Sequence, residues 1–278
     1  MDFFSQYSIP WILGLIAALW VTGLIAGMLA GLLGVGGGIV IVPVLFQLFT
    51  FLGIDETVRM HVTVGTSLAT IIPTSIMSSR AHRKRGSLDP TLIRHLMPSV
   101  VLGVLVGSIA SRYLTGATLT AVFACMALLV ALSMAFKPDG FAISDGLPGR
   151  AGTALIGGGI GGISTLMGIG GGTLGVPILN AIRVPMHTAV GTGAMLGTVI
   201  SIPGAIAFLV NGLGMPNRPP FCFGYINLLG FSLIVPATMV ATGWGAKLAH
   251  SINALRLRQV FAGFLALTSL RMFYGLIH

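Results

Sequence analysis

Gly34-Val35-Gly36-Gly37-Gly38-Ile39-Val40-Ile41-Val42-Pro43 recurs later in the chain as Gly168-Ile169-Gly170-Gly171-Gly172-Thr173-Leu174-Gly175-Val176-Pro177. Each copy lies within apolar sequence that would otherwise form a plain membrane helix. Consecutive glycines followed by a proline interrupt such a helix, because glycine adopts many backbone conformations and proline lacks an N–H. The same interruption in two halves is typical of transporters built from repeats with one broken helix each. We therefore predict helix breaks at both motifs, with Pro43 and Pro177 as break residues.

The composition of the 278-residue chain predicts a protein embedded in the lipid bilayer. Hydrophobic residues make up 55% and charged residues only 8%, whereas soluble domains carry about 25% charge. The net charge of +9 does not indicate nucleic-acid binding, because Lys and Arg fall in short loops where they set membrane orientation. Cys125 and Cys222 form neither a disulfide framework nor a metal motif, and we expect no cofactor.

Ten apolar segments are predicted, and two of them are short. Since a helix rises 1.5 Å per residue, about 20 residues cross a hydrocarbon core of about 30 Å. The short segments, 38–53 and 173–182, either cross fully or are re-entrant, and the sequence leaves both options open. The predicted fold is an all-α polytopic transmembrane helical bundle with broken or short helices at the Gly-rich motifs. The segments lie at 9–33, 38–53, 61–79, 96–111, 117–136, 151–167, 173–182, 187–209, 225–246 and 259–277.

Three alignments within the chain indicate an internal repeat. The Gly-rich motifs align at an offset of 134 residues, from Gly34 to Gly168, and Gly65 aligns with Gly191 at an offset of 126. A third set aligns at 138, pairing Pro98, Gly107 and Phe123 with Pro236, Gly245 and Phe261. We therefore divide the chain into a first transmembrane repeat at 1–136, a cytoplasmic linker at 137–150 and a second transmembrane repeat at 151–278.

The positions of the basic loops predict that the two halves insert in opposite orientations. Loop 80–95 is strongly basic, whereas its counterpart 210–224 has only Arg218, and the basic loop of the second half comes one position later, at 247–258. Basic loops face the cytoplasm. The predicted architecture is therefore two inverted five-span repeats with both termini outside. On this arrangement four of the fifteen basic residues lie outside: Arg59, Arg112, Arg218 and Arg271.

The acidic residues all fall in predicted loops or tails: Asp2, Asp55, Glu56, Asp89, Asp139 and Asp145. A cation transporter or proton pump usually carries a carboxylate inside the membrane, because an unpaired buried cation is costly. The predicted spans contain none, which favours an anionic or neutral substrate.

Glycine runs at helix starts are the first candidates for binding such a substrate. A helix start presents backbone N–H groups and the positive end of the helix dipole, and both suit a small oxyanion. The alternative is that the glycines only allow close helix packing. The predicted substrate-binding glycines are Gly36, Gly37, Gly38, Gly170, Gly171 and Gly172.

Side-chain hydroxyls just inside the following spans are the second group of candidates. Thr66, Ser67 and Thr192 are predicted to donate hydrogen bonds to the substrate; alternatively, each bonds to a carbonyl of its own helix. Ser67 of the first half aligns with Gly193 of the second, so the second half lacks the hydroxyl that Ser67 supplies.

Two histidines are repeated between the halves, His61 and His187. A pKa near 6.5 would let either carry a proton in a coupled cycle, and Na⁺ is the other candidate coupling ion. The alternative is that both are helix-start residues at the membrane boundary. The basic cluster at 80–85 either steers anions toward a cytoplasmic mouth or only sets orientation.

The paired Gly-x-Gly-Gly-Gly…Pro motifs, each followed by His-x-x-Val-Gly-Thr, resemble the sulfite exporter TauE/SafE family of membrane permeases. The basic loop 83–89 and Pro98…Gly103…Gly107 are similar to the same family. The resemblance covers nearly the whole chain. It implies transport of small sulfur-containing anions, such as sulfite or organosulfonates, across the bacterial cytoplasmic (inner) membrane by a secondary carrier.

The leading prediction is thus a secondary transporter that exports such anions by alternating access. The alternative is an anion channel in which the paired glycine elements form the filter. We do not expect an enzyme, because the predicted spans contain no Asp or Glu and no His-Glu-x-x-His motif, and no Gly-x-x-x-x-Gly-Lys-Ser/Thr motif indicates an ATPase. The anion, the direction of transport, the coupling ion and a homo-oligomeric state are left open.

Overall fold

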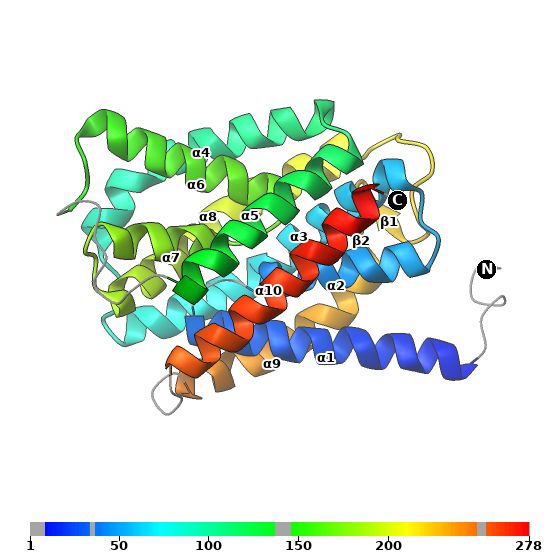
Figure 1. The fold of residues 1–278 in the computed structure, drawn as a ribbon, viewed down its shortest axis with the longest axis horizontal. Helices are drawn as coiled ribbons and strands as arrows, with labels where there is room; N and C mark the ends of the chain where they lie inside the picture. Colours follow the sequence, from blue (N-terminus) through cyan, green and yellow to red (C-terminus); the bar gives the residue numbers. More distant parts are fainter. Residues whose placement is uncertain (1–8, 34–36, 137–145, 249–253, 278) are drawn as a thin grey trace.

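The computed structural model describes residues 9–33, 37–136, 146–248 and 254–277 (Figure 1). The regular secondary structure within these residues is helical apart from one two-stranded antiparallel hairpin, β1 (Cys222–Phe223) with β2 (Ile226–Asn227). The helices are α1 (Ile9–Leu33), α2 (Gly38–Phe51), α3 (Glu56–Lys84), α4 (Pro90–Tyr113), α5 (Gly116–Phe136), α6 (Arg150–Met167), α7 (Gly171–Ala181), α8 (Met186–Asn211), α9 (Leu228–Leu248) and α10 (Ala254–Ile277). Six described helices are long and apolar enough to cross a membrane, namely α1, α3, α4, α5, α8 and α9. The predicted all-α polytopic membrane fold is confirmed.

Helices α2 and α7 are too short to cross a bilayer by themselves. They have 14 and 11 residues, or about 21 Å and about 17 Å, against a core of about 30 Å. Gly37 lies against the carbonyl of Ala26, seven residues before the end of α1 at Leu33. The chain has therefore turned back by about 10 Å along α1 before α2 begins. The start of α2 is consequently inside the bundle.

The helix breaks lie at the glycines and not at the prolines that follow them. Pro43 and Pro177 are inside α2 and α7, and both helices continue through them. Each proline lies in the second turn, beyond the four N–H groups that a helix start leaves without partners, so each removes one intrahelical bond without ending its helix. The left-handed backbone at Gly37 (φ 75°) and Gly168 (φ 68°) turns the chain instead, as glycine allows. The prediction that the prolines are the break residues is corrected accordingly.

Helix α3 is longer at both ends than the predicted span 61–79. Asp55 caps its start by accepting the Thr57 N–H at 2.9 Å, which replaces a bond that the first helical turn lacks. Its last turn carries His82, Arg83 and Lys84, and basic residues stabilise the negative end of the helix dipole. The helix therefore extends beyond its apolar part.

The start of the ninth predicted span, 225–246, was wrong. Tyr225, Ile226 and Asn227 belong to the hairpin region, and α9 begins at Leu228. Positive φ angles at Phe221 and Gly224 turn the chain there. The Asn227 side chain then accepts the Gly230 N–H at 2.8 Å and so caps α9.

Helices from the two halves pack side by side. α1 lies along α9, and α4 lies along α6 at the opposite edge of the bundle, while α10 (red) and α5 (green) run together across the front (Figure 1). α3 contacts α2, α8 and α9, and it is the most buried of the candidate spans. α3 is therefore the central helix of the bundle.

Close glycine contacts between the halves come in equivalent pairs. In each pair a glycine lies against a backbone carbonyl of the other half, and the two contacts are related by the offsets found in the sequence. Such an exchange of contacts is expected of two repeats related by a twofold axis. The orientation of each half in the membrane stays a prediction. In the first pair Gly107 contacts Gly162 and Gly245 contacts Met28; in the second Gly161 contacts Val100 and Gly27 contacts Thr238. In the third pair Gly157 contacts Leu96 and Gly23 contacts Ile234; in the fourth Gly65 contacts Tyr225 and Gly191 contacts Ser87.

The capping carboxylate of Asp55 makes stability sensitive to acid. Hydrogen bonds from the Thr57 hydroxyl and N–H, and one from Asn217, hold the pKa of Asp55 below its usual value of 3.8. A lowered pKa stabilises the fold above the unfolded-state pKa, and this contribution is lost as the pH falls through the folded pKa. We expect the melting temperature of the wild type to fall more between pH 5 and pH 3 than that of Asp55→Asn, whose amide still accepts from Thr57. Parallel melting curves would contradict this.

Candidate functional site

The two helix breaks meet inside the bundle. Gly38, the first residue of α2, lies against Gly168, which caps the C-terminus of α6. A methyl group on Gly38 would come within 2.7 Å of the Gly168 carbonyl oxygen and 3.0 Å of the Ile169 Cα. These backbones approach so closely that only glycine fits at position 38. Gly38 and Gly168 come from different halves of the chain, and both are buried.

One face of α3 runs across this meeting point. Ser67, Ile71 and Ser75 are spaced by four residues and so share that face. The Ser67 hydroxyl donates to the Gly168 carbonyl at 2.6 Å, and a methyl on Gly38 would meet the end of the Ile71 side chain. Ser75 lies against Gly197 of α8, and a methyl added at Gly197 would lie 3.8 Å from the Gly171 nitrogen. Helix α3 therefore contacts both breaks.

The starts of α2 and α7 supply backbone donors at these breaks. Glycine caps both helices, at Gly37 and Gly170, and neither start has a side-chain cap. The first N–H groups of a helix have no partner within it, and here they are those of Gly38 and of Gly171 and Gly172. Two positive helix-dipole ends thus lie in the bundle interior. The remaining predicted glycine, Gly36, lies outside the described residues.

The three predicted hydroxyls are all fully buried, but they differ in their hydrogen bonding. Thr66 accepts the backbone N–H of Asn227 at 2.8 Å, and Ser67 donates to Gly168. Neither bonds to its own helix, unlike the neighbouring Thr63, which donates to Arg59 O. The hydroxyl of Thr192 has no hydrogen-bond partner among the described residues.

Thr192 directly precedes the residue of α8 that packs against the start of α7. The adjacent residue Gly193 packs against Gly172, where an added methyl would come within 2.8 Å of the Gly172 Cα. A buried hydroxyl without a partner is costly and uncommon in folded proteins. Thr192 is therefore the predicted hydroxyl that is most available to a ligand.

The two repeated histidines lie in unlike surroundings. His187 is exposed, whereas His61 is 6% exposed and its Nε2 lies 3.3 Å and 3.2 Å from the carbonyl oxygens of Ser111 and Leu114. Because a carbonyl only accepts, we assign the proton of neutral His61 to Nε2. Its Nδ1 has no partner within the described chain. A role in proton coupling stays a prediction for both residues.

Two features of the site were missed from the sequence. Ser75 accepts the Thr198 hydroxyl at 3.1 Å, and its spacing of two helical turns from Ser67 was a usable signal. Asn227, whose N–H bonds to Thr66, stands directly before an apolar span, as a capping residue does. Both lie where α3 contacts the second half of the chain.

The fold and the paired breaks define the class of protein. Helices long enough to cross a membrane surround two short helices that start in the interior, from corresponding points of two halves. This is the architecture of a polytopic helical membrane protein, and discontinuous helices of this kind are typical of secondary transporters.

Comparison with known proteins identifies the family. Residues 19–272 match the profile of the sulfite exporter TauE/SafE family, so the chain belongs to that family and is a multi-pass membrane transporter. It is 34% identical to a probable membrane transporter protein of Haemophilus influenzae, over 90% of this chain and 95% of that one. It is 29% identical to one of Methanocaldococcus jannaschii, over 93% and 95% of the two chains, and 28% identical to one of Bacillus subtilis, over 84% and 86%. No solved structure matches the chain.

Proposed function

We propose that the protein is a secondary transporter that exports small sulfur-containing anions, such as sulfite or organosulfonates, across the bacterial cytoplasmic membrane. Membership of the sulfite exporter family supports this. The observation that carries the proposal is the contact of Gly38 with Gly168, which brings the two breaks together in the interior. The anion binds there to N–H groups at the starts of α2 and α7 and to the Thr192 hydroxyl, and no acidic side chain is required.

Two hydrogen bonds between the halves suggest how access alternates. Ser67 to Gly168 and Asn227 to Thr66 each join α3 to the second half of the chain. Rocking of one half against the other breaks such bonds and frees the Ser67 and Thr66 hydroxyls for the anion. The anion thus replaces the Gly168 carbonyl as the acceptor for Ser67, whereas Thr66 donates its own hydroxyl hydrogen to the anion. Protons are carried by His61 or His187 if transport is proton-coupled.

The test is thermal stabilisation of the purified protein, because a ligand that binds only the folded state raises its melting temperature. We expect sulfite, thiosulfate, sulfoacetate or taurine to raise it, and sulfate, acetate and chloride to have no effect. No shift with any of the sulfur anions would refute the proposed substrate class. Saturable counterflow in vesicles would then support a carrier, whereas currents without saturation or exchange would support the channel alternative.

A further inference from the structure

Two short segments occupy equivalent places at opposite ends of the antiparallel pair α3 and α8. Residues 87–89 precede α4 and residues 225–227 precede α9, and the two segments align at the offset of 138. The first residue of each segment contacts a glycine of the other half through its carbonyl oxygen, Gly191 for the first segment and Gly65 for the second. We call the two places the basic end, where the basic last turn of α3 meets the start of α8, and the hairpin end, where β2 meets the start of α3.

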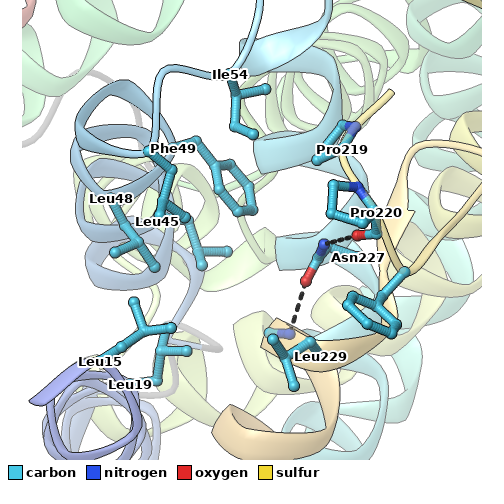
Figure 2. Close-up of a pocket in the computed structure, with 13 residues that line it drawn as sticks. Leu15, Leu19, Leu45, Leu48, Phe49, Ile54, Pro219, Pro220, Asn227 and Leu229 are labelled. Atoms are coloured by element: carbon cyan, nitrogen blue, oxygen red, sulfur yellow. Dashed lines mark hydrogen bonds between the residues drawn. The ribbon is translucent and has the colours of Figure 1, made fainter. Parts of the chain in front are cut away.

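The last residue of each segment caps the helix that follows it. The Asn227 side chain accepts the Gly230 N–H at 2.8 Å (Figure 2), and the Asp89 side chain accepts the Leu92 N–H at 3.1 Å. Gly230 and Leu92 are themselves equivalent at the offset of 138. The two segments therefore match in position, in glycine contact and in capping.

The two ends differ in one hydrogen bond. At the hairpin end the backbone N–H of Asn227 donates to the Thr66 hydroxyl at 2.8 Å. The equivalent groups at the basic end are the N–H of Asp89 and the hydroxyl of Thr192, yet the Thr192 hydroxyl is buried without a partner in the described part of the chain. A buried hydroxyl without a partner is costly and calls for an explanation. The repeat indicates the group that it bonds to in another conformation, which is the Asp89 N–H.

The basic end is also the less tightly packed of the two. All three residues at 225–227 are buried, whereas all three residues at 87–89 are only half-buried. The repeated histidines differ in the same direction, because His61 at the hairpin end is buried and His187 at the basic end is exposed. The basic end is therefore the one that opens more readily from this conformation.

We propose that the Thr66–Asn227 bond and a Thr192–Asp89 bond alternate, so that each forms when the other breaks. The structure represents the conformation with the hairpin-end bond formed and the basic-end bond broken. Two repeats with one fold can exchange their conformations, and that exchange moves each arrangement to the other end of the bundle. This inference rests on the alternating access of the proposed function and not on its substrate.

Two cysteine reporters measure which end opens. Ser79→Cys lies near the basic end and Ala205→Cys, at the equivalent position by the offset of 126, lies near the hairpin end; both positions are buried. Each reporter is placed in full-length protein in which Cys125→Ala and Cys222→Ala remove the native thiols. A buried thiol reacts with a hydrophilic maleimide only while its end is open. The labelling rate of Ala205→Cys divided by that of Ser79→Cys therefore reports the balance of the two conformations.

Valine variants of the two threonines should change this ratio in opposite directions. Thr66→Val breaks the hairpin-end bond, so the ratio should rise about fivefold, which is the effect of one ordinary hydrogen bond on an equilibrium. Thr192→Val removes a bond that forms only in the other conformation, so the ratio should fall about fivefold. The controls Thr66→Ser and Thr192→Ser keep the hydroxyl and should keep the wild-type ratio.

An unchanged ratio in either valine variant would overturn the inference. A change in the same direction in both would also overturn it, because general loosening of the fold acts alike on the two substitutions. The labelling uses no anion, so its result is independent of the substrate. If sulfur anions stabilise the wild type and the ratio does not respond, the inference alone fails. If the ratio responds in opposite directions and no sulfur anion binds, the proposed substrate class alone fails.

Discussion

Gly38→Ala is expected to weaken anion binding and transport by about ten- to a hundredfold. The added methyl would sit 2.7 Å from the Gly168 carbonyl oxygen, where ordinary contact begins at 3.4 Å, and 3.0 Å from the Ile169 Cα. Backbone cannot rotate away as a side chain can, so the two breaks must separate by roughly the missing distance. A displacement of about 1 Å in a binding constellation reduces activity about a hundredfold. The measurement is anion-dependent thermal stabilisation together with counterflow.

Two further variants isolate the cause of this loss. Gly159→Ala on α6 adds the same methyl where nothing lies within 4 Å, and it should bind anions like the wild type. The methyl at position 38 also meets the end of the Ile71 side chain, so Ile71→Val is combined with Gly38→Ala to remove that contact alone. Recovery of binding in the double variant would show that Ile71, and not the approach of the two breaks, caused the loss.

The meeting of the breaks could be predicted in outline from the sequence, because a repeated motif predicts equivalent positions in two halves. The sequence could not predict which carbonyl Gly38 approaches, because the spacing of residues within a motif does not determine distances between the two halves. The same holds for the partners of Ser67 and Thr66, which lie 101 and 161 residues away. Short motifs indicate helix starts and breaks but not which group a hydroxyl bonds to.

Secondary-structure boundaries show a related limit. Hydropathy placed the start of the ninth span at 225, but Gly224 and Phe221 turn the chain and Asn227 caps α9. Apolar residues in a hairpin resemble the first turn of a membrane helix in composition. The capping signal of Asn227 outweighs that resemblance, because an Asx side chain satisfies N–H groups that an apolar start would leave without partners.

Thr192→Val is the second variant with a large expected effect, and it separates binding from stability. Valine keeps the shape of threonine and removes only the hydroxyl, which has no partner among the described residues. Loss of an unpaired buried hydroxyl should leave the melting temperature of the ligand-free protein unchanged or raise it. A hydrogen bond to a charged group contributes about 1.5–3 kcal/mol, so the anion should bind roughly ten- to a hundredfold more weakly.

Thr66→Val is the matched comparison, because Thr66 is the equivalent residue of the first half. Its hydroxyl accepts the buried N–H of Asn227, and removing an acceptor from a buried donor costs about 1–3 kcal/mol. We therefore expect the ligand-free Thr66→Val protein to melt several degrees lower, unlike Thr192→Val. If Thr192→Val instead lowered the melting temperature and bound the anion like the wild type, its hydroxyl would have a structural partner and no role in the site. Opposite effects of one substitution on the melting temperature at these two equivalent positions would show that only the Thr66 hydroxyl stabilises the ligand-free fold.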